Sequence, residues 1–462
     1  MMKFEFKHLG LLDHAELELA DLTLICGENN TGKTYATYAV YGFLRNWRQL
    51  LGSVFSIEIQ ALLSRTKENK IDLAEMFDGK INNYLMGMGG DYTKHLSTVF
   101  ASDDSMFKKS IFIPTLLQTI DISQHAYQSS VHTSRRGKVS AIIEKEAGST
   151  LLKVLVADTD LPPRAYRNFV IDAIADIVFA PSLPRVHIAS AERTGAAIFR
   201  KELDTARTRM LKAINQVDSK ELKRNPFIFL KEMDSGYALP VEDNVEFVRQ
   251  LEDMDKHTSE VAQSNPELIE AFDAIIGGSY KVVKQQLVFQ AGGVGKARFN
   301  MNEASSSIRA LLDIGFYLRC HAKAGDLFII DEPELNLHPK SQRAFARLVV
   351  RMINAGIKVF ITTHSDYLVK ELNTLIMLHQ GTEHTKKMQK QYDYQDQELL
   401  DPSRIRLYMT GLAKPAGGRS KKIRTLIPAK IYPDRGIEVS TFDDTIDLMN
   451  TIQSDILYGG EL

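Results

Sequence analysis

The sequence is poor in features that define several other classes of protein. Its 462 residues include only two cysteines, Cys26 and Cys320, which lie far apart among apolar residues. We therefore expect a reduced, cytoplasmic protein without a disulfide framework. No apolar run approaches the roughly 18 residues of a membrane span. The opening MMKFEFKHLG alternates like a strand and lacks the apolar core of a signal peptide. No membrane partner is expected.

Excess charge of either sign is also lacking. The net charge is −1, with 44% hydrophobic and 25% charged residues and no low-complexity tract. Binding to nucleic acid would therefore require a local basic patch. The length is sufficient for roughly three compact units.

A phosphate-binding motif is present near the N-terminus. Residues 21–34 read DLTLICGENNTGKT, an apolar strand over residues 22–26 followed by the pattern G-x-x-x-x-G-K-[ST]. A helix is expected from residue 34 to about residue 51. Glycines let backbone N–H groups turn toward a phosphate, Lys33 reaches the β- and γ-phosphates, and the Thr34 hydroxyl ligates Mg²⁺. The expected ATP contacts are Gly27, Asn29, Asn30, Thr31, Gly32, Lys33, Thr34 and Tyr35.

Two further apolar strands end in polar groups. Residues 327–330 form a predicted core strand that ends in Asp331 and Glu332, and residues 359–362 form another that is followed by His364. Beside a phosphate loop, Asp331 is expected to hold Mg²⁺ and Glu332 to act as general base toward the attacking water. His364 is expected to contact the γ-phosphate and orient that water. Glu332 and His364 are thus the predicted catalytic residues.

The order of these motifs resembles that of the ABC-type ATPases of the SMC, RecF and OLD group. The matching segments are GENNTGKT, SSS, LFIIDEPELNLHP and TTHS. They lie within residues 1–50 and 280–380, and DEPELNLHP is closer to the OLD-like and RecF-like branch than to transporters. The resemblance implies an α/β fold: an ABC-type P-loop ATPase head, with a mixed β-sheet, flanking helices and a helical insertion.

The same resemblance implies a dimer that sandwiches two ATP molecules. In that family a second subunit completes each site, and Ser305 and Ser306 match the serines that bind γ-phosphate in trans. The family usually continues Ser-Ser-Gly, whereas Ser307 stands here, so we expect slow hydrolysis. From the residues alone, a serine run is equally typical of a helix N-cap.

The expected organisation has three parts. Residues 1–190 form an N-terminal ATPase lobe and residues 196–276 a helical insertion. Residues 280–462 form a C-terminal lobe with the signature serines, the acidic strand end, His364 and a β/α tail. The first arm of the insertion is basic and the second is acidic. These arms either neutralise each other within one hairpin or pair between chains to build a higher homo-oligomer.

Other positions are open to two readings. Arg193, in the segment AERTG, either faces phosphate or a neighbouring subunit, or belongs to a charged loop. A γ-phosphate-sensing glutamine is not assigned among Gln118, Gln124 and Gln128. The basic loop over residues 419–424 is either a solvated hairpin or a contact for nucleic acid or an acidic partner.

Function is predicted from the resemblance and from what the tail lacks. The chain after His364 is too short for the Toprim nuclease of OLD enzymes and has no convincing acidic cluster. It resembles stand-alone ATPase subunits of bacterial anti-phage systems, which control a separate Toprim nuclease and respond to a phage-encoded trigger. The alternatives are a RecF-like repair clamp on DNA and the ATPase of another two-gene system, Septu-like or retron-associated.

Overall fold

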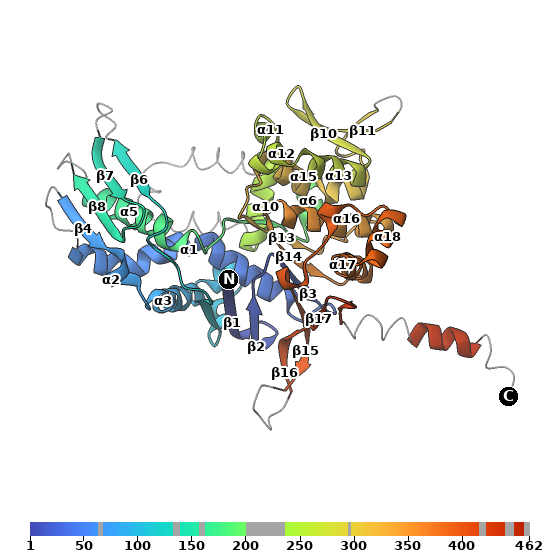
Figure 1. Ribbon diagram of the computed structural model, residues 1–462, viewed down its shortest axis with the longest axis horizontal. Coiled ribbons are helices and arrows are strands. Elements are labelled where there is room, and N and C mark those ends of the chain that lie inside the picture. The colour runs from blue at the N-terminus through green and yellow to red at the C-terminus, as the bar shows by residue number, and fades with distance from the viewer. Residues whose placement is uncertain are drawn as a thin grey trace, which may run out of the picture. The chain divides into compact units, whose positions relative to one another are not determined.

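The computed structural model describes residues 1–62, 68–132, 139–156, 162–199, 236–293, 297–414, 422–438 and 448–456 (Figure 1). The chain forms two compact units. Unit 1 comprises residues 1–19, 39–97 and 102–185, and unit 2 comprises residues 20–38, 98–101 and 186–462. The phosphate-loop segment therefore belongs with the C-terminal part of the chain. The three-part division expected from the sequence remains a prediction.

Unit 2 is built on a six-stranded sheet with the order β16-β15-β3-β14-β13-β9. Its strands are β3 (Leu22–Cys26), β9 (Val186–Ala189), β13 (Leu327–Asp331), β14 (Lys358–Thr363), β15 (Ile405–Ala413) and β16 (Ile423–Pro428). The first five are mutually parallel, and β16 pairs antiparallel at the edge. This mixed sheet with flanking helices confirms the predicted α/β fold class.

The apolar runs of the central strands explain their place in the sheet. Every residue of β3 and β13 is buried, which is typical of parallel strands covered on both faces. Helices α16 (Pro339–Asn354) and α17 (Asp366–Leu378) pack on the sheet through apolar stripes that join one core. Pro339 at the first turn, with the His338 side chain accepting from the Lys340 N–H, starts α16.

The remaining elements of unit 2 follow or precede these strands. Its helices are α6 (Arg193–Ile198), α10 (Leu239–Arg249), α11 (Leu251–Met254), α12 (Glu260–Ser264), α13 (Pro266–Ile276), α14 (Ser306–Ala310), α15 (Leu312–Phe316), the π-helical η3 (Tyr317–His321), α18 (Glu383–Gln391), η4 (Asp396–Glu398) and η5 (Pro402–Arg404). Its smaller sheets contain β10 (Gly278–Val283), β11 (Gln286–Ala291) and β12 (Arg298–Asn300), and β17 (Ile431–Tyr432) with β18 (Gly436–Ile437).

Unit 1 contains two antiparallel sheets. One has the order β2-β1-β5, from β1 (Met2–Leu9), β2 (Leu12–Glu18) and β5 (Ile111–Leu116). The other has the order β4-β8-β7-β6, from β4 (Glu68–Asp72), β6 (Tyr127–His132), β7 (Val139–Lys145) and β8 (Leu151–Val156). Its helices are α2 (Leu73–Phe77), α3 (Ile81–Thr93), α4 (Leu96–Phe100), η1 (Asp104–Phe107), α5 (Pro163–Ile174) and the π-helical η2 (Ala175–Phe179), although the last residues of α4 fall in unit 2.

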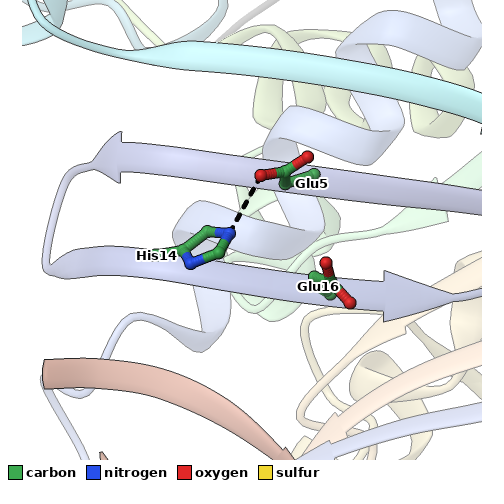
Figure 2. A group of neighbouring side chains, drawn as sticks. All are labelled: Glu5, His14 and Glu16. Atoms are coloured by element: carbon green, nitrogen blue, oxygen red, sulfur yellow. Dashed lines mark hydrogen bonds and ion pairs between the residues drawn. The ribbon is translucent and has the colours of Figure 1, made fainter. Parts of the chain in front are cut away.

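The solvent face of β1 and β2 carries Glu5, His14 and Glu16 (Figure 2). The His14 Nε2 lies 2.9 Å from the Glu5 Oε1. Lysines also reach both carboxylates, since the Lys3 Nζ lies 2.7 Å from the Glu16 Oε2 and the Lys7 Nζ 3.0 Å from the Glu5 Oε1. Because each carboxylate already has a cationic partner, the arrangement is that of cross-strand ion pairing rather than of an open metal site.

Several local predictions can be compared with the structure. The strand expected in the opening segment MMKFEFKHLG is present as β1, and the helix expected after the phosphate loop is α1 (Lys33–Leu62), longer than predicted. The second arm of the insertion is helical over α10 to α13. The basic first arm lies outside the described residues, as do residues 419–421 of the basic loop 419–424. None of the helices in the described ranges has the length and apolar character that crossing a bilayer requires.

Candidate ATP site

Four neighbouring strand ends assemble the candidate site within unit 2. Strands β3, β14, β13 and β9 run parallel, so their carboxyl ends lie at one edge of the sheet. The phosphate loop (residues 27–34) follows β3, Asp331 and Glu332 end β13, and His364 follows β14. Ligands of open α/β sheets bind at this edge. The topology therefore brings the phosphate loop together with two motifs that lie about 300 residues further along the sequence.

The phosphate loop has the backbone that a phosphate cradle requires. Gly27, Asn30 and Gly32 have φ values of +143°, +61° and +104°, and such conformations favour glycine and asparagine. Lys33 is buried, and its Nζ donates to the carbonyl oxygens of Gly27 at 2.8 Å and Glu28 at 2.7 Å. The ammonium group thus lies across the mouth of the loop, where a β- or γ-phosphate oxygen would replace these acceptors.

The predicted contacts of the loop differ in exposure. Asn29, Asn30 and Thr34 are exposed, whereas Thr31 and Tyr35 are half-buried. The Tyr35 ring lies tilted against that of Phe100, with 5.3 Å between ring centroids. The exposed Thr34 hydroxyl at the first turn of α1 is free of the sheet and suits the predicted role toward Mg²⁺.

Strand β15 supports the loop through a residue that sequence reasoning missed. The Thr410 hydroxyl lies 2.6 Å from the Thr31 hydroxyl and donates to the Cys26 carbonyl at 3.3 Å. A Cβ atom on Gly27 would lie 1.9 Å from the Thr410 Oγ1. Gly27 is therefore required by a close approach as well as by its φ angle.

Asp331 is a buried carboxylate at the end of β13. It is 2% exposed and accepts a hydrogen bond from the Thr362 hydroxyl. Burial raises the pKa of Asp331 to about 6, with a further upward contribution from the neighbouring carboxylates of Glu332 and Glu192. Burial and mutual repulsion of grouped carboxylates at a dry strand end are offset by a proton or by a cation among them. Asp331 and Thr34 therefore fit the Mg²⁺ ion that accompanies ATP, which would neutralise the phosphate charge.

Glu332 and His364 face each other across the ends of β13 and β14. The His364 Nδ1 lies 3.6 Å from the Glu332 Oε1 and 3.5 Å from the Glu334 Oε1. Glu332 has a φ of +48°, an uncommon backbone for a residue with a side chain and one that recurs at active sites. The pair is partly exposed, as a water-activating base and its neighbour must be.

Glu334 holds the histidine loop in place. It is buried, and its Oε1 accepts from the Thr363 hydroxyl and from the His364 N–H, both at 2.8 Å. The carboxylate thereby fixes the backbone that presents His364. The repeated acid of the segment DEPE was the available signal for this role in the sequence.

Glu192 is a fourth acidic group at the site that the sequence did not reveal. The Tyr38 hydroxyl donates to its Oε2 at 3.4 Å, and its charge contributes to the raised pKa of Asp331. Burial, together with Asp331 and Glu192, raises the pKa of Tyr38 well above its usual value. Tyr38 therefore stays a hydrogen-bond donor beside three carboxylates.

The prediction that Arg193 faces phosphate or a neighbouring subunit is wrong. Arg193 is 1% exposed, and its guanidinium donates only to carbonyl oxygens of its own chain in the described structure: Ala310 at 2.8 Å, Ser190 at 3.0 Å, Asp331 at 2.6 Å and Glu332 at 2.7 Å. Arg193 is also not a solvated loop residue, because its guanidinium is buried and its N–H donors converge on buried carbonyl oxygens.

The signature turn (residues 305–307) has exposed residues at Ser305 and Ser306, and Ser307 is half-buried. Ser305 caps α14, and its hydroxyl accepts from the Ile308 N–H and lies 2.8 Å from the Ser307 hydroxyl. Ser306 is also exposed at the first position of α14. The N-cap reading thus holds for Ser305, and both serines remain accessible to a second chain.

Two glutamines considered as γ-phosphate sensors have partners within unit 1. The Gln118 Oε1 accepts from the N-terminal amine at 3.1 Å, and the Gln128 Nε2 donates to the Glu144 Oε1 at 3.0 Å. Gln124 is exposed. The position of such a sensor stays unassigned.

A glycine-bearing phosphate loop with its lysine, and a buried acid followed by a second carboxylate at the end of a strand in the same sheet, define a P-loop ATPase. The family comparison gives the same class. The chain belongs to the AAA_15 family, described as an AAA ATPase domain, whose model matches residues 1–369. None of the curated proteins compared with the chain matches it.

Among solved structures, 121 chains match. One is the Smc head domain with an extended coiled coil bound to the C-terminal domain of ScpA, from Pyrococcus furiosus, at 12% identity, covering 98% of this chain and 100% of that one with a TM-score of 0.32. Another is the SMC head domain from Thermotoga maritima, at 9% identity, covering 93% and 98% with a TM-score of 0.31. These likenesses are too distant to add to the family assignment.

Proposed function

We propose that the chain is an ATP-dependent dimerisation switch. The observation that carries this proposal is that one chain holds the nucleotide-binding motifs at one sheet edge and exposes the signature serines on a separate turn. The phosphate loop, Asp331, Glu332 and His364 lie at one sheet edge, whereas Ser305 and Ser306 are exposed and the hydroxyl bonds of Ser305 stay in its own turn. A second copy that presents these serines to the γ-phosphate would complete the site, so ATP would hold two chains together and hydrolysis would release them.

Mixing two inactive variants tests the shared site. Lys33→Ala removes the phosphate contact, and Ser306→Arg blocks the signature turn. Each alone is expected to lose ATPase activity, whereas an equimolar mixture recovers about a quarter of the wild-type rate, because half the dimers are mixed and one of their two sites is intact. A mixture as inactive as its components would contradict the shared site, and homodimers of each variant are the controls.

The biological role that we propose is that of sensor and oligomeric scaffold in an anti-phage defence system. The support is the resemblance of DEPELNLHP and TTHS to OLD-like ATPases, a group that includes stand-alone subunits such as AriA of the PARIS system. In this role the assembled ATPase restrains a separate effector, a Toprim-type nuclease. It releases that effector when a phage-encoded trigger protein is sensed.

Native mass spectrometry tests this role. The Glu332→Gln chain is purified from its host with the neighbouring genes intact and is then measured in ATP and Mg²⁺. A stoichiometric second protein on a multimer of the chain supports the defence scaffold. A dimer that carries nucleic acid and no protein partner supports the RecF-like repair clamp instead. A partner without a nuclease fold favours another two-gene system, Septu-like or retron-associated.

A further inference from the structure

One buried arginine joins the two halves of the ATPase machinery within a chain. Arg193 is the first residue of α6, directly after the end of β9. Its NH1 and NH2 groups donate to the carbonyl oxygens of Asp331 and Glu332, at 2.6 and 2.7 Å. Its Nε donates to the carbonyl oxygen of Ala310 at 2.8 Å. Ala310 is the last residue of α14, the helix that starts at the signature turn.

The geometry of this side chain makes the link stiff. A guanidinium is planar, and its donors keep fixed directions, so three carbonyl groups bound to it keep fixed positions relative to one another. Two of these carbonyls belong to the residues that carry the predicted Mg²⁺ ligand and the predicted base. The third belongs to the helix that presents Ser305 and Ser306. A displacement of the acidic strand end is therefore transmitted to α14.

A buried charge at this position lowers the stability of the fold, which indicates that the charge serves a function. Arg193 is 1% exposed, and a buried cation without a direct carboxylate partner is destabilising compared with apolar packing. Its charge lowers the pKa of two acids, Asp331 and Asp313, against the upward effect of their burial. Asp313 lies in α15, which continues from α14. The cation thus stands between a carboxylate of the nucleotide site and one of the signature segment.

A second hydrogen-bonded path runs parallel to the first. The Asn244 Nδ2 donates to the Asp313 Oδ2 at 2.9 Å, and the Ser190 hydroxyl donates to the Asn244 Oδ1 at 3.2 Å. Ser190 also supplies the fourth carbonyl that Arg193 binds. The path connects α10 of the insertion, α15 and the end of β9, and all of these partners are buried.

We propose that Arg193 is a positioning residue that couples the two half-sites of one chain, its own nucleotide site and the signature turn that it offers to a partner. This inference rests on the proposed shared site. When Mg²⁺ and ATP settle at the acidic strand end, Arg193 carries the shift of the Asp331 and Glu332 backbone to Ala310 and sets the signature turn for engagement. Occupied chains would then engage their partners better than empty ones.

Heterodimers purified through two affinity tags separate the two directions of this coupling. In the first, an Arg193→Lys chain is paired with a Glu332→Gln chain, which is expected to bind ATP without hydrolysing it, so the active site uses the phosphate loop and acids of the Arg193→Lys chain. In the second, a chain with both Arg193→Lys and Glu332→Gln is paired with an unmodified chain, so the active site uses the signature turn of the doubly substituted chain, whose own site is occupied by ATP. The reference is the Glu332→Gln and unmodified pair.

We expect kcat to fall roughly tenfold in both heterodimers relative to the reference, within the usual range of site coupling, with the ATP dissociation constant unchanged. A fall in the first heterodimer alone would show a purely local role and overturn the proposal. If the reference pair itself lacks activity, the shared site fails and not the role of Arg193. Hydrogen exchange at residues 305–311 gives a readout besides activity: ATP should increase protection in wild type and not in Arg193→Lys.

Arg404→Lys is the control for loss of a half-buried arginine. The Arg404 guanidinium also ties separate segments, donating to the Asp21 carboxylate at 2.7 Å and to the Ile353 carbonyl at 2.9 Å. A fall in melting temperature without loss of coupling is expected. If Arg193→Lys does not fold, Asp313→Asn carries the test: the second heterodimer should lose activity and the first should not. Unchanged activity in both would overturn the proposal.

Discussion

The phosphate loop and the signature turn both precede a helix and carry hydroxyl groups, yet they are built in opposite ways. The phosphate loop has two glycines and an asparagine at positive φ, a buried lysine, and a threonine of β15 behind it. The signature turn lacks glycine, exposes Ser305 and Ser306, and bonds the Ser305 hydroxyl to that of Ser307. One has the backbone of a cradle for a phosphate of its own chain, and the other is the surface that we propose a second chain engages.

Removing the lysine should break the cradle and give the largest effect. Lys33→Ala eliminates the ammonium group that lies across the mouth of the loop. We expect ATP binding to become undetectable at concentrations about a hundredfold above the wild-type dissociation constant, as for loss of a desolvated charge contact. Equilibrium binding of a fluorescent ATP analogue measures this. Lys94→Ala, which loses an exposed pair with Asp91, should bind normally.

Substituting the predicted base, Glu332, should separate binding from hydrolysis. Glu332→Gln keeps the shape of the side chain but cannot accept a proton from water. We expect kcat to fall about a hundredfold or more, with ATP affinity retained. Single-turnover hydrolysis and sedimentation in ATP measure the two properties. Wild-type turnover in Glu332→Gln would remove Glu332 as the base, and Glu303→Gln, beside the signature turn, is the surface control.

The buried acid should make the nucleotide-free chain sensitive to pH. Because burial raises the folded-state pKa of Asp331 to about 6, the folded chain holds a proton that the unfolded chain has lost between about pH 4 and pH 6. Stability from this group is thus present at low pH and decreases as pH rises to 6, by about 3 kcal/mol. Mg²⁺-dependent ATP binding should strengthen over the same interval, because the ion requires the carboxylate.

Asp331→Asn sharpens that test. The amide does not titrate, so the free energy of unfolding of the variant relative to wild type should increase from pH 4 to pH 7 by about 3 kcal/mol. Urea unfolding of the nucleotide-free proteins over this range measures the difference. A difference that is constant with pH would mean that Asp331 keeps an ordinary pKa.

The elements that sequence reasoning located share one property: their signal is local. A strand followed by GENNTGKT, or four apolar residues before Asp331, can be recognised within about ten residues. Thr410 could not be found this way, because its contact with Thr31 joins residues 379 positions apart. Arg193 shows the opposite failure. An arginine after a strand reads the same whether it faces solvent or the core, and only the fold places three distant carbonyl groups around it.

The smallest expected effect concerns the signature turn, where Ser307 stands instead of a glycine. The Ser307 hydroxyl is hydrogen-bonded to the Ser305 hydroxyl at 2.8 Å. This bond competes with the proposed contact between Ser305 and a γ-phosphate. Ser307→Gly should raise kcat by a few-fold, since one competing hydrogen bond of about 1 kcal/mol is removed. The helix start loses a similar amount of stability. Steady-state kinetics with Ser307→Ala, which removes only the hydroxyl, separates the two effects.

The place of β15 has a consequence for where the ATPase begins and ends. The family match stops at residue 369, yet β15 lies at residues 405–413, pairs with the phosphate-loop strand, and brings Thr410 under the loop. A chain cut at the end of the match would leave β3 as a bare edge of the sheet and Gly27 without its neighbour. The segment that matches the family therefore ends before the segment that the folded site requires. The minimal catalytic fragment is expected to extend at least to the end of β15.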